Sequence, residues 1–471
     1  MSLQRRLTLR IFRSGAGLCG VGCAFGATWT AVTRRYIRKG AHMSEKPHKR
    51  IINAWCLYDW GNSAFSTTVE AAVLPVFFKE VAAKGLPGNA ATVYWGYAAA
   101  VALLVTAVMA PILGSIGDYT GRKKRFLAAF AALGIAATAL LFLVTEGRWP
   151  LALGCVVVGS IGFAGAAIFY DSLLPHIAQP DEIDYVSSKG YALGYLGGGL
   201  LLAVNVGMIL LLGATLGSRL SFLTVAFWWG AFTVPLLRWV PEPAANTAGI
   251  GGGVNPVVAG FRRLGDTFRN LRRYRQLFLF LIAFWLYNDG IGTIIKMATI
   301  YGSEIGIGMM DLIGALLVTQ FVGIPFSLLF GRFAGRIGTK RAIMLGLGWY
   351  TLISIAGYFM QAAWHFWALA FAVGMVQGGT QALSRSLFGV MAPRASSAEF
   401  YGFYDVSSKF AGIAGPALFA FVGQLTGSSR LSIVALVIFF IGGILLLTRV
   451  NEQEGIRAAG EENRAAELAT A

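Results

Sequence analysis

Charged residues are scarce in this chain of 471 residues: Asp, Glu, Lys and Arg make up 13% of it, whereas 56% is hydrophobic. A soluble globular domain carries roughly 25% charged residues, so this chain has about half the charge needed to cover a water-facing surface. Folded in water, it would expose large apolar patches. The composition therefore excludes an ordinary soluble enzyme and a disordered chain, and it indicates an integral membrane protein.

Cysteine and histidine are also scarce, with four residues of each type. Four scattered cysteines exclude a disulfide-rich secreted domain, and neither residue type has the spacing of a metal site or a redox pair. The motifs of a nucleophile elbow, a phosphate-binding loop and a zinc protease are missing as well. We therefore expect no enzyme activity, no metal and no cofactor, and we interpret these side chains as packing residues of helices: Cys19, Cys23, Cys56, Cys155, His42, His48, His176 and His365.

Long apolar runs, in contrast, are frequent. A helix that crosses a bilayer needs about 20 mostly apolar residues, and turn signals and charges delimit twelve runs of this kind. They lie at 51–79, 93–116, 125–145, 150–178, 187–212, 220–240, 276–302, 311–332, 341–361, 364–392, 402–426 and 431–449. The predicted fold class is therefore an all-α membrane protein with twelve transmembrane helices.

The basic residues are distributed unevenly between these runs. Lys and Arg number 39 against 22 Asp and Glu, and the formal net charge is +17. If the first span starts in the cytoplasm, the connections that face the outside hold only Lys79, Lys84, Arg148, Arg219 and Arg430. This asymmetry follows the positive-inside rule. It predicts that both termini are cytoplasmic, and it explains the net charge without a nucleic-acid partner.

Internal repeats divide the twelve spans into two halves of six. GSIGDYTGRKK at 114–124 aligns with GRFAGRIGTKR at 331–341, each after an even-numbered span. VSSK occurs at 186–189 and again at 406–409. The repeats keep one order along the chain, as expected for a duplicated six-helix unit, which is the architecture of many secondary transporters.

Five segments follow from these boundaries: a basic cytoplasmic extension at 1–50, a six-helix half at 51–240, a linker at 241–275, a second six-helix half at 276–450 and a cytoplasmic tail at 451–471. The linker ends with six arginines that alternate with apolar residues. An amphipathic helix on the anionic inner leaflet is the simplest interpretation. We interpret the first 42 residues as a dispensable extension; a signal or targeting peptide is the alternative.

Ionisable residues inside the spans locate the expected pathway, because a charge at the bilayer centre costs roughly 2.5–3.5 kcal/mol. They recur on the first, fourth, seventh and tenth spans. Helical periodicity gathers them with nearby polar residues into stripes that predict a central polar cavity. The candidate substrate or coupling residues are Asp59, Asn62, Ser63, Ser66, Glu70, Asp171, Asp289, Thr293, Lys296, Gln377, Gln381 and Arg385. Interhelical pairing without a pathway is the alternative.

The loop after the second span predicts a gate. Gly121 permits a sharp turn, and Asp118 can accept hydrogen bonds from Arg122 or cap the N-terminus of a neighbouring helix. Such contacts would hold the two halves together on the cytoplasmic side; a plain loop with retention charges is the alternative. The candidate gate residues are Gly114, Asp118, Gly121, Arg122 and Lys123.

The candidate gate resembles the signature of the major facilitator superfamily, G-x-x-x-D-x-x-G-R-[RK], which follows the second span of its members. The second-half copy keeps Gly331, Gly338 and Lys340 but has Gly335 at the position of the aspartate. The resemblance covers essentially 51–450 and implies the major facilitator fold, with two pseudo-symmetric halves. The departure at Gly335 puts a second, symmetric gate in doubt.

A finer resemblance lies in the first span, where YDWGNSAFSTTV at 58–69 precedes LPVFF at 74–78. This segment is similar to that of the "unknown major facilitator" family, bacterial relatives of the fungal autophagy-related vacuole effluxer. The resemblance implies a twelve-helix permease, and amino-acid efflux is the activity attributed to the vacuolar branch. It does not by itself imply the substrate of this chain, because the motif can stabilise the fold or couple transport to an ion and need not select the substrate.

The sequence thus predicts a secondary transporter that moves a small polar solute, an amino acid or a related metabolite, by alternating access. The expected partners are this solute, a coupling proton and the lipid bilayer, and the expected setting is a monomer in a bacterial inner membrane. Asp59, Asn62 and Glu70 would contact a substrate amine or a proton. Arg385 would hold a carboxylate, or pair with Asp171 or Asp59 as an inner gate. A membrane sensor or scaffold on the same fold, or a transporter of sugars or drugs, is the alternative.

Overall fold

The computed structural model describes residues 45–87, 90–246, 254–269, 273–410 and 412–470. The chain divides into two units, Met1–Lys49 and Arg50–Ala471. The first unit is described only at 45–49, where the first helix begins, so the extension predicted at 1–42 lies outside the described residues. The architecture below is that of the second unit.

Six spans form the first half, and each coincides with a predicted apolar run. The first span begins as α3 (Glu45–Ala64) and continues as η1 (Phe65–Val73), α4 (Leu74–Phe77) and η2 (Phe78–Ala82). The π turns of η1 and η2 flank Pro75, which lacks the N–H that a regular helix requires. The remaining spans are α5 (Ala90–Thr120), α6 (Lys123–Leu140) with η3 (Leu141–Leu143), α7 (Trp149–Ile177), α8 (Ile183–Leu212) and α9 (Ala214–Trp239).

The second half repeats this arrangement after the linker helix α10 (Pro256–Arg269). Its first four spans are α11 (Arg275–Glu304), α12 (Met309–Ile337), α13 (Thr339–Tyr358) and α14 (Ala363–Met391). The eleventh span consists of two helices, α15 (Ser397–Phe410) and α16 (Ala414–Thr426), preceded by η4 (Arg394–Ser396), and the twelfth of α17 (Ser429–Ala435) and α18 (Val437–Arg449). The tail forms α19 (Glu452–Thr470). The predicted fold class, twelve spans in two six-helix halves, is confirmed.

Eight helices of the described residues are each long and apolar enough to cross a membrane by themselves. The other four spans include α3, α13, α14 and α15. Two of these four, the first and the eleventh, are interrupted, and α14 carries buried polar residues such as Gln377 and Arg385. Polar or interrupted spans are tolerated where neighbouring helices shield them from lipid, which accounts for the first, tenth and eleventh spans; α13 instead exposes large apolar side chains such as Leu345 and Leu352.

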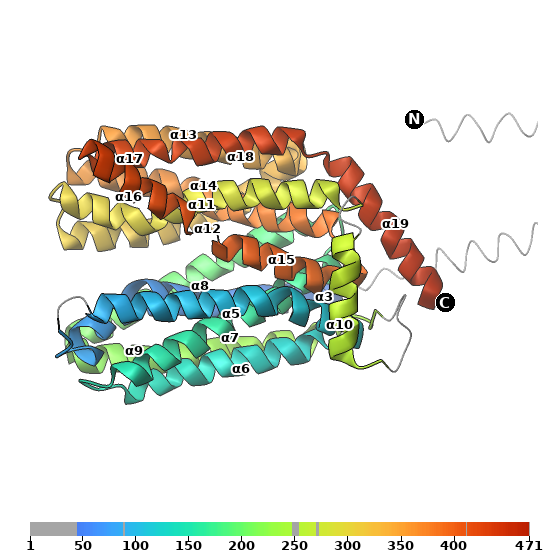
Figure 1. Cartoon of the computed structure of the whole chain (residues 1–471), viewed down its shortest axis with the longest axis horizontal. Helices are drawn as coiled ribbons and strands as arrows, with labels where there is room; N and C mark the ends of the chain where they lie inside the picture. The colour runs from blue at the N-terminus through green and yellow to red at the C-terminus, as the bar shows by residue number, and fades with distance from the viewer. Residues whose placement is uncertain (1–44, 88–89, 247–253, 270–272, 411, 471) are drawn as a thin grey trace, which may run out of the picture. The chain divides into compact units, whose positions relative to one another are not determined.

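Each half has its own hydrophobic core, and the two groups of helices are visible in Figure 1, one coloured blue to green and the other yellow to red. Trp55, Tyr58 and Trp229 are fully buried in the first core, and Tyr287 and Tyr350 in the second. One residue crosses over: Ala398, at the start of α15 in the second half, belongs to the core of the first half. The halves are therefore separate packing units that meet through inserted elements.

The halves meet where α5 and α7 pack against α15, and where α8 packs against α12 and α14. Glycine permits these close approaches. A Cβ at Gly114 on α5 would lie 2.1 Å from the main-chain O of Ala398, and one at Gly331 on α12 would lie 2.6 Å from Ser188 Oγ on α8. Without a hydrophobic force between helices in lipid, small residues and hydrogen bonds determine such contacts.

The glycines in the middle of α8 serve the same purpose inside the first half. A Cβ at Gly197 would lie 2.3 Å from the main-chain O of Trp60, and one at Gly198 would lie 3.1 Å from the Thr67 side chain. These glycines bring α8 against the first span. Gly207, ten residues further along the same helix, has no heavy atom within 4 Å of its Cβ position.

We therefore expect Gly197→Ala to lower the melting temperature of the detergent-solubilised protein, because the added methyl group forces α8 away from the first span. Gly207→Ala is the matched control and should leave the melting temperature unchanged or slightly raised, since alanine favours helix by about 1 kcal/mol over glycine. Fluorescence-detected size-exclusion chromatography after heating measures both. Equal melting temperatures for the two variants would contradict the packing assigned to Gly197.

Candidate functional site

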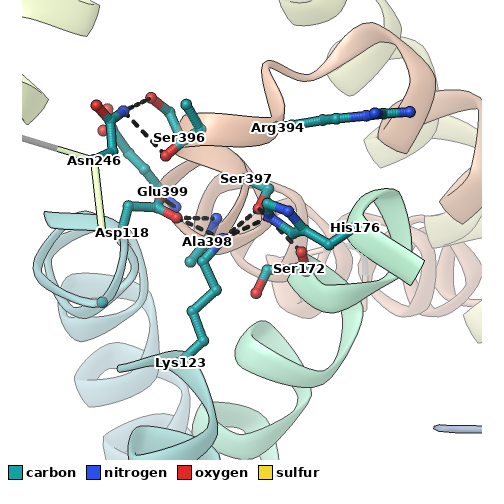
Figure 2. Close-up of polar contacts among 12 residues, drawn as sticks. Asp118, Lys123, Ser172, His176, Asn246, Arg394, Ser396, Ser397, Ala398 and Glu399 are labelled. Atoms are coloured by element: carbon teal, nitrogen blue, oxygen red, sulfur yellow. Dashed lines mark hydrogen bonds and ion pairs between the residues drawn. The ribbon is translucent and has the colours of Figure 1, made fainter. Parts of the chain in front are cut away.

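The contact between Asp118 and the start of α15 joins the two halves at one end of the bundle, which we call the gate end (Figure 2). Asp118 Oδ1 accepts a hydrogen bond from the Ala398 N–H at 3.1 Å, and Oδ2 accepts one from the Glu399 N–H at 2.8 Å. The first N–H groups of a helix have no partner within the helix and carry the positive end of its dipole. A buried carboxylate of the first half therefore caps a helix of the second.

Lys123, at the start of α6, completes this contact. Its Nζ lies 2.7 Å from Asp118 Oδ1, donates to Ser397 Oγ at 2.6 Å and lies 3.1 Å from His176 Nε2. Ser397 Oγ in turn donates to the main-chain O of Ser172 on α7 at 3.0 Å. We call Asp118, Lys123, His176, Ser397 and the start of α15 the gate network. It joins three helices of the first half to one of the second.

The remaining residues of the predicted gate shape its backbone. Gly121 has a φ of +62° and lies against the linker, where a Cβ would be 2.6 Å from the Ala245 nitrogen. Arg122 is exposed. The linker itself is attached to the gate, because Asn246 N–H donates to the main-chain O of Asp118 at 2.8 Å and its Nδ2 donates to the main-chain O of Ala395 at 3.0 Å.

The structure brings three predicted residues together around Arg385 on α14. Arg385 Nη1 lies 3.0 Å from Asp171 Oδ1 on α7 and 3.4 Å from Asp59 Oδ2 on α3. Its Nε and Nη2 donate to Ser187 Oγ and to the main-chain O of Ser187 on α8, each at 2.9 Å. We call Arg385, Asp59, Asp171 and Ser187 the arginine cluster. All partners of this second-half guanidinium belong to the first half.

Aromatic rings close the arginine cluster on its faces. The Arg385 guanidinium carbon lies 4.9 Å from the centroid of the Trp55 ring and 4.4 Å from that of Tyr191, distances typical of cation–π contacts. Tyr170 Oη donates to Asp59 Oδ2 at 3.1 Å. Removing one partner of such a buried, hydrogen-bonded pair costs roughly 3–5 kcal/mol, because the other charge is left buried without compensation; the cluster is thus a second polar contact between the halves.

Glu70 and Lys296 line a cavity of about 450 Å³ between the halves. Glu70, on η1, accepts a hydrogen bond from Ser160 Oγ at 3.2 Å, whereas Lys296 on α11 is exposed and forms no hydrogen bond or ion pair with any described residue. Most of the lining is apolar and includes Phe65 and Trp95. The cavity therefore presents one carboxylate and one ammonium group on an apolar background.

The polar residues of the first span differ in their contacts: Ser63 packs against α8, whereas the side-chain oxygen of Asn62 has no hydrogen-bond donor among the described residues. Asn62 is buried, and its Oδ1 accepts no hydrogen bond from any described residue. Ser63 lies where a Cβ at Gly194 of α8 would approach its Oγ to 2.6 Å, so it forms part of the contact with α8. Ser66 is half-buried. The narrow stripe expected here thus reaches from the arginine cluster at Asp59 to the cavity at Glu70.

Asp289 and Thr293 do not line the central cavity expected from the sequence; they lie on α11, at the start of α16. Asp289 Oδ2 accepts from the Ala414 N–H at 3.0 Å and Oδ1 from the Gly415 N–H at 2.9 Å, so this carboxylate caps α16. Thr293 Oγ1 donates to the main-chain O of Asp289 at 2.7 Å. The two helices of the eleventh span are therefore each capped by an aspartate from a neighbouring helix, Asp118 for α15 and Asp289 for α16. Interruption of the span creates this second N-terminus.

Gln377 and Gln381 lie on α14, within the second half. Gln377 lines a small cavity of about 90 Å³ together with Gln320 and Ser354, and the Oε1 atoms of both glutamines lack a hydrogen-bond donor among the described residues. Gln381 is half-buried. The predicted stripes therefore do not line one cavity: they divide among the arginine cluster, the inter-half cavity, the α16 cap and this second-half cavity.

Sequence reasoning missed several residues of the site. Ser187 belongs to the VSSK repeat, which could have identified it as a candidate site residue. Ser160 and Tyr170 belong to no motif described in the sequence. His176 was interpreted as a packing residue, and the structure places it in the gate network. Asp184 was not a candidate either, although it accepts hydrogen bonds from Thr339 at 2.6 Å and from Ser386.

The second copy of the gate motif has Gly335 where the first has an aspartate. Asp184, from the first half, provides a carboxylate near this second copy. It lies in the first turn of α8 and accepts a hydrogen bond from Thr339 at the start of α13. Lys340, the basic residue of the second copy, donates instead to the main-chain O of Val450 at 2.9 Å. The gate end is therefore asymmetric, with a helix cap on one side and a side-chain hydrogen bond on the other.

Two six-helix halves, joined at one end by a carboxylate–helix contact and enclosing a cavity, define a transporter of the major facilitator type. The crystal structure of the human organic anion transporter MFSD10 (TETRAN) has this fold, with a TM-score of 0.67 at 12% identity over 85% of this chain and 99% of that one. The sequence also matches the family described as "Vacuole effluxer Atg22 like" over residues 47–460. The chain belongs to this family.

Two relatives illustrate the breadth of the family. The uncharacterized MFS-type transporter YxiO of Bacillus subtilis (strain 168) is 41% identical over 419 residues, which cover 87% of this chain and 97% of that protein. Autophagy-related protein 22-2 of Aspergillus oryzae is 24% identical over 453 residues, which cover 77% of this chain and 75% of the relative. The protein is thus a multi-pass membrane transporter that binds small molecules, and not an enzyme.

The gate network predicts the effect of removing its carboxylate. Asp118→Ala leaves two buried N–H groups of α15 without a partner and removes the counter-charge of the Lys123 ammonium, so we expect the gate end to open more often. Ser188→Cys reports this opening, because Ser188 is fully buried between the halves and its Oγ has no described hydrogen-bond partner. In a background free of other cysteines, maleimide should label Cys at position 188 at least fivefold faster in the Asp118→Ala variant.

Asp266→Asn is the control for this prediction. Asp266 is an exposed carboxylate of α10 whose side chain lies 3.8 Å from Arg269. Its removal should leave the labelling rate unchanged. An unchanged rate in Asp118→Ala as well would show that the carboxylate does not hold the gate end closed.

Proposed function

We propose that the protein is a secondary transporter of zwitterionic small molecules, with an amino acid or a related metabolite as substrate. The observation that carries this proposal is the pair Glu70 and Lys296, which line the same inter-half cavity from opposite halves. A carboxylate suits a substrate ammonium group, and an ammonium suits a substrate carboxylate. A cavity of about 450 Å³ lies within the usual range for a small-molecule site.

The apolar lining supports an amino acid over a sugar. Phe65, Val69, Leu74, Trp95 and Leu103 surround the two charges and would contact the side chain of the substrate. Sugars need several hydrogen-bond partners, because each unpaired hydroxyl costs free energy on burial. The alternatives of a sugar or a drug carrier, and of a sensor without turnover, are distinguished by the flux experiment below.

Arg385 has a different role in this proposal. Its guanidinium already contacts Asp59, Asp171 and Ser187, and three aromatic rings lie near it, so little of it is left for a substrate carboxylate. We assign Arg385, Asp59 and Asp171 to closure of the gate end, and Asn62, between this cluster and Glu70, to the path of the substrate. The halves then rock about the cavity, opening the gate end as the opposite end closes.

The gate end faces the cytoplasm in this proposal. The basic residues of the α5–α6 loop and of the linker favour this side by the positive-inside rule, and the match to YxiO favours a bacterial plasma membrane. On α10, exposed Val257, Val258 and Phe261 lie beside exposed Arg262. We expect this surface to lie on the anionic inner leaflet. An ion or solute gradient would supply the energy, with a proton as our proposed coupling ion.

The substrate site predicts the effect of neutralising either charge. We expect Glu70→Gln and Lys296→Met each to raise the Kd for an amino acid at least tenfold, because each loses one charge-assisted hydrogen bond, worth roughly 1.5–3 kcal/mol. Titration calorimetry of the purified protein against a panel of amino acids, sugars and nucleosides provides the measurement. Uptake into proteoliposomes then distinguishes a transporter, with saturable flux, from a sensor that binds without flux.

An exposed pair of the same chemistry provides the control. Lys84 and Glu146 lie 3.0 Å apart with both side chains 62% exposed. Lys84→Met and Glu146→Gln remove the same charges from the protein and should leave Kd and uptake unchanged. If sugars bind and amino acids do not, or if all four variants behave alike, the substrate class proposed here is wrong.

The role of Arg385 predicts a different kinetic result. Arg385→Lys keeps the charge but loses the planar fork that contacts Ser187 and both carboxylates. We expect the maximal uptake rate to fall at least tenfold, with a change in substrate Kd of less than about threefold. A rise in Kd as large as that of Lys296→Met would instead make Arg385 a substrate-binding residue.

A further inference from the structure

His176 contributes an imidazole ring to the gate network. It lies in the last turn of α7, partly buried, with its ring beside the contact of Lys123 with Ser397 (Figure 2). Its Nε2 lies 3.1 Å from Lys123 Nζ and 3.1 Å from Ser397 Oγ. The ring also forms a hydrogen bond with the main chain of Arg394. A titratable ring therefore lies within the contact that closes the gate end.

The contacts of the ring favour its neutral form, because two cations, Lys123 and Arg394, lie near it. An ammonium group has three protons to donate and no lone pair, and the Lys123 ammonium has three partners: Asp118 Oδ1, Ser397 Oγ and His176 Nε2. Ser397 directs its own proton to the main-chain O of Ser172. We assign the lone pair of Nε2 to Lys123, because this gives the third ammonium proton an acceptor; the proton of the neutral ring then lies on Nδ1, toward Arg394.

Protonation of Nε2 reverses this contact. An imidazolium would direct an N–H and a positive charge toward the Lys123 ammonium at 3.1 Å. The charged groups near the ring do not offset this repulsion. Lys123 on α6 and Arg394 on η4 are both cations, the Asp118 carboxylate on α5 is already engaged by Lys123 and two N–H groups, and the Glu399 carboxylate on α15 accepts a hydrogen bond from Thr267 of α10.

We propose that His176 is a proton-binding site that opens the gate end when it is protonated. The closed gate holds the neutral ring, and opening separates the ring from Lys123 and α15, so the proton binds only to the open state. Acidification on the side that the gate end faces therefore shifts the protein toward the state open to that side. This inference rests on the proposed alternating access, but it is independent of the substrate proposed above.

Distances between spin labels test this without any substrate. Arg125 at the start of α6 and Arg336 near the end of α12 are exposed residues at the gate end of the two halves. In a variant with Arg125→Cys and Arg336→Cys and with the four native cysteines replaced, pulsed electron resonance gives the populations of short and long distances. An ordinary imidazole gains its proton between pH 7.5 and 5.5, so we expect the open-to-closed ratio to rise about tenfold across this range.

Three further variants isolate the cause. His176→Gln keeps an acceptor that can face Lys123 but cannot be protonated, so its ratio should stay constant from pH 7.5 to 5.5. His365→Gln removes another histidine, at the start of α14, and should keep the full tenfold response. Lys123→Met removes the second cation while leaving His176 in place, and it should abolish the response even though it favours the open state at every pH.

The proposal is overturned if the wild-type ratio does not change with pH, if His176→Gln responds like wild type, or if Lys123→Met keeps the tenfold response. If His176→Gln fails to fold, the Lys123→Met result still decides between these outcomes. Because no substrate is added, failure of the amino-acid proposal leaves this measurement unaffected. Conversely, an open-to-closed ratio that does not change with pH would overturn the role of His176 but would not affect the substrate-binding results for Glu70 and Lys296.

Discussion

The rest of the structure depends on the contact between the Asp118 carboxylate and the first N–H groups of α15. The N-terminus of a buried helix must be capped, because its first N–H groups have no partner within the helix and a buried N–H without a partner costs free energy. Here the cap comes from the other half of the protein. When the gate end is closed, the first N–H groups of α15 therefore have the Asp118 carboxylate as their acceptor. When it opens, these groups lose that acceptor and face solvent. The two arrangements provide a physical basis for two discrete states.

The polar residues of the bundle divide into groups with different chemistry. Those of the gate network and the arginine cluster pair with each other across the halves, so the free energy of their burial is offset while the gate end is closed. Glu70 and Lys296 line the inter-half cavity, and Lys296 forms no hydrogen bond or ion pair with any described residue, although the Asp289 carboxylate is near enough to interact with its charge. Charged groups that pair with each other across the halves stabilise the closed gate end. A charged group that lines a cavity and forms no hydrogen bond or ion pair is available to bind a ligand. This difference motivates our separation of gate from substrate site.

The sequence predicted what depends on local pattern. Twelve spans follow from apolar runs, and a motif within one loop made Asp118 and Lys123 gate candidates, with a helix N-terminus as one of two partners expected for Asp118. Pairing of Arg385 with Asp59 and Asp171 was among the alternatives that helical position allowed. The cap formed by Asp289 was not, because it depends on the interruption between α15 and α16, and no pattern marks that interruption. His176 and Ser187 acquire partners on α15 and α14 only when the halves meet, so their contacts could not be derived from sequence spacing.

The most direct test of this account measures access to the inter-half cavity and to the gate end, each with its own single-cysteine variant. Ile413 lines the inter-half cavity, and Ser188 is buried at the gate end. With Ile413→Cys and Ser188→Cys in separate cysteine-free backgrounds, a membrane-impermeant maleimide is applied to vesicles of both orientations, with and without a transported amino acid. The account predicts reciprocal changes: substrate that lowers labelling at position 413 from one side raises labelling at position 188 from the other. Both positions reacting from the same side, or changing in parallel, would contradict it.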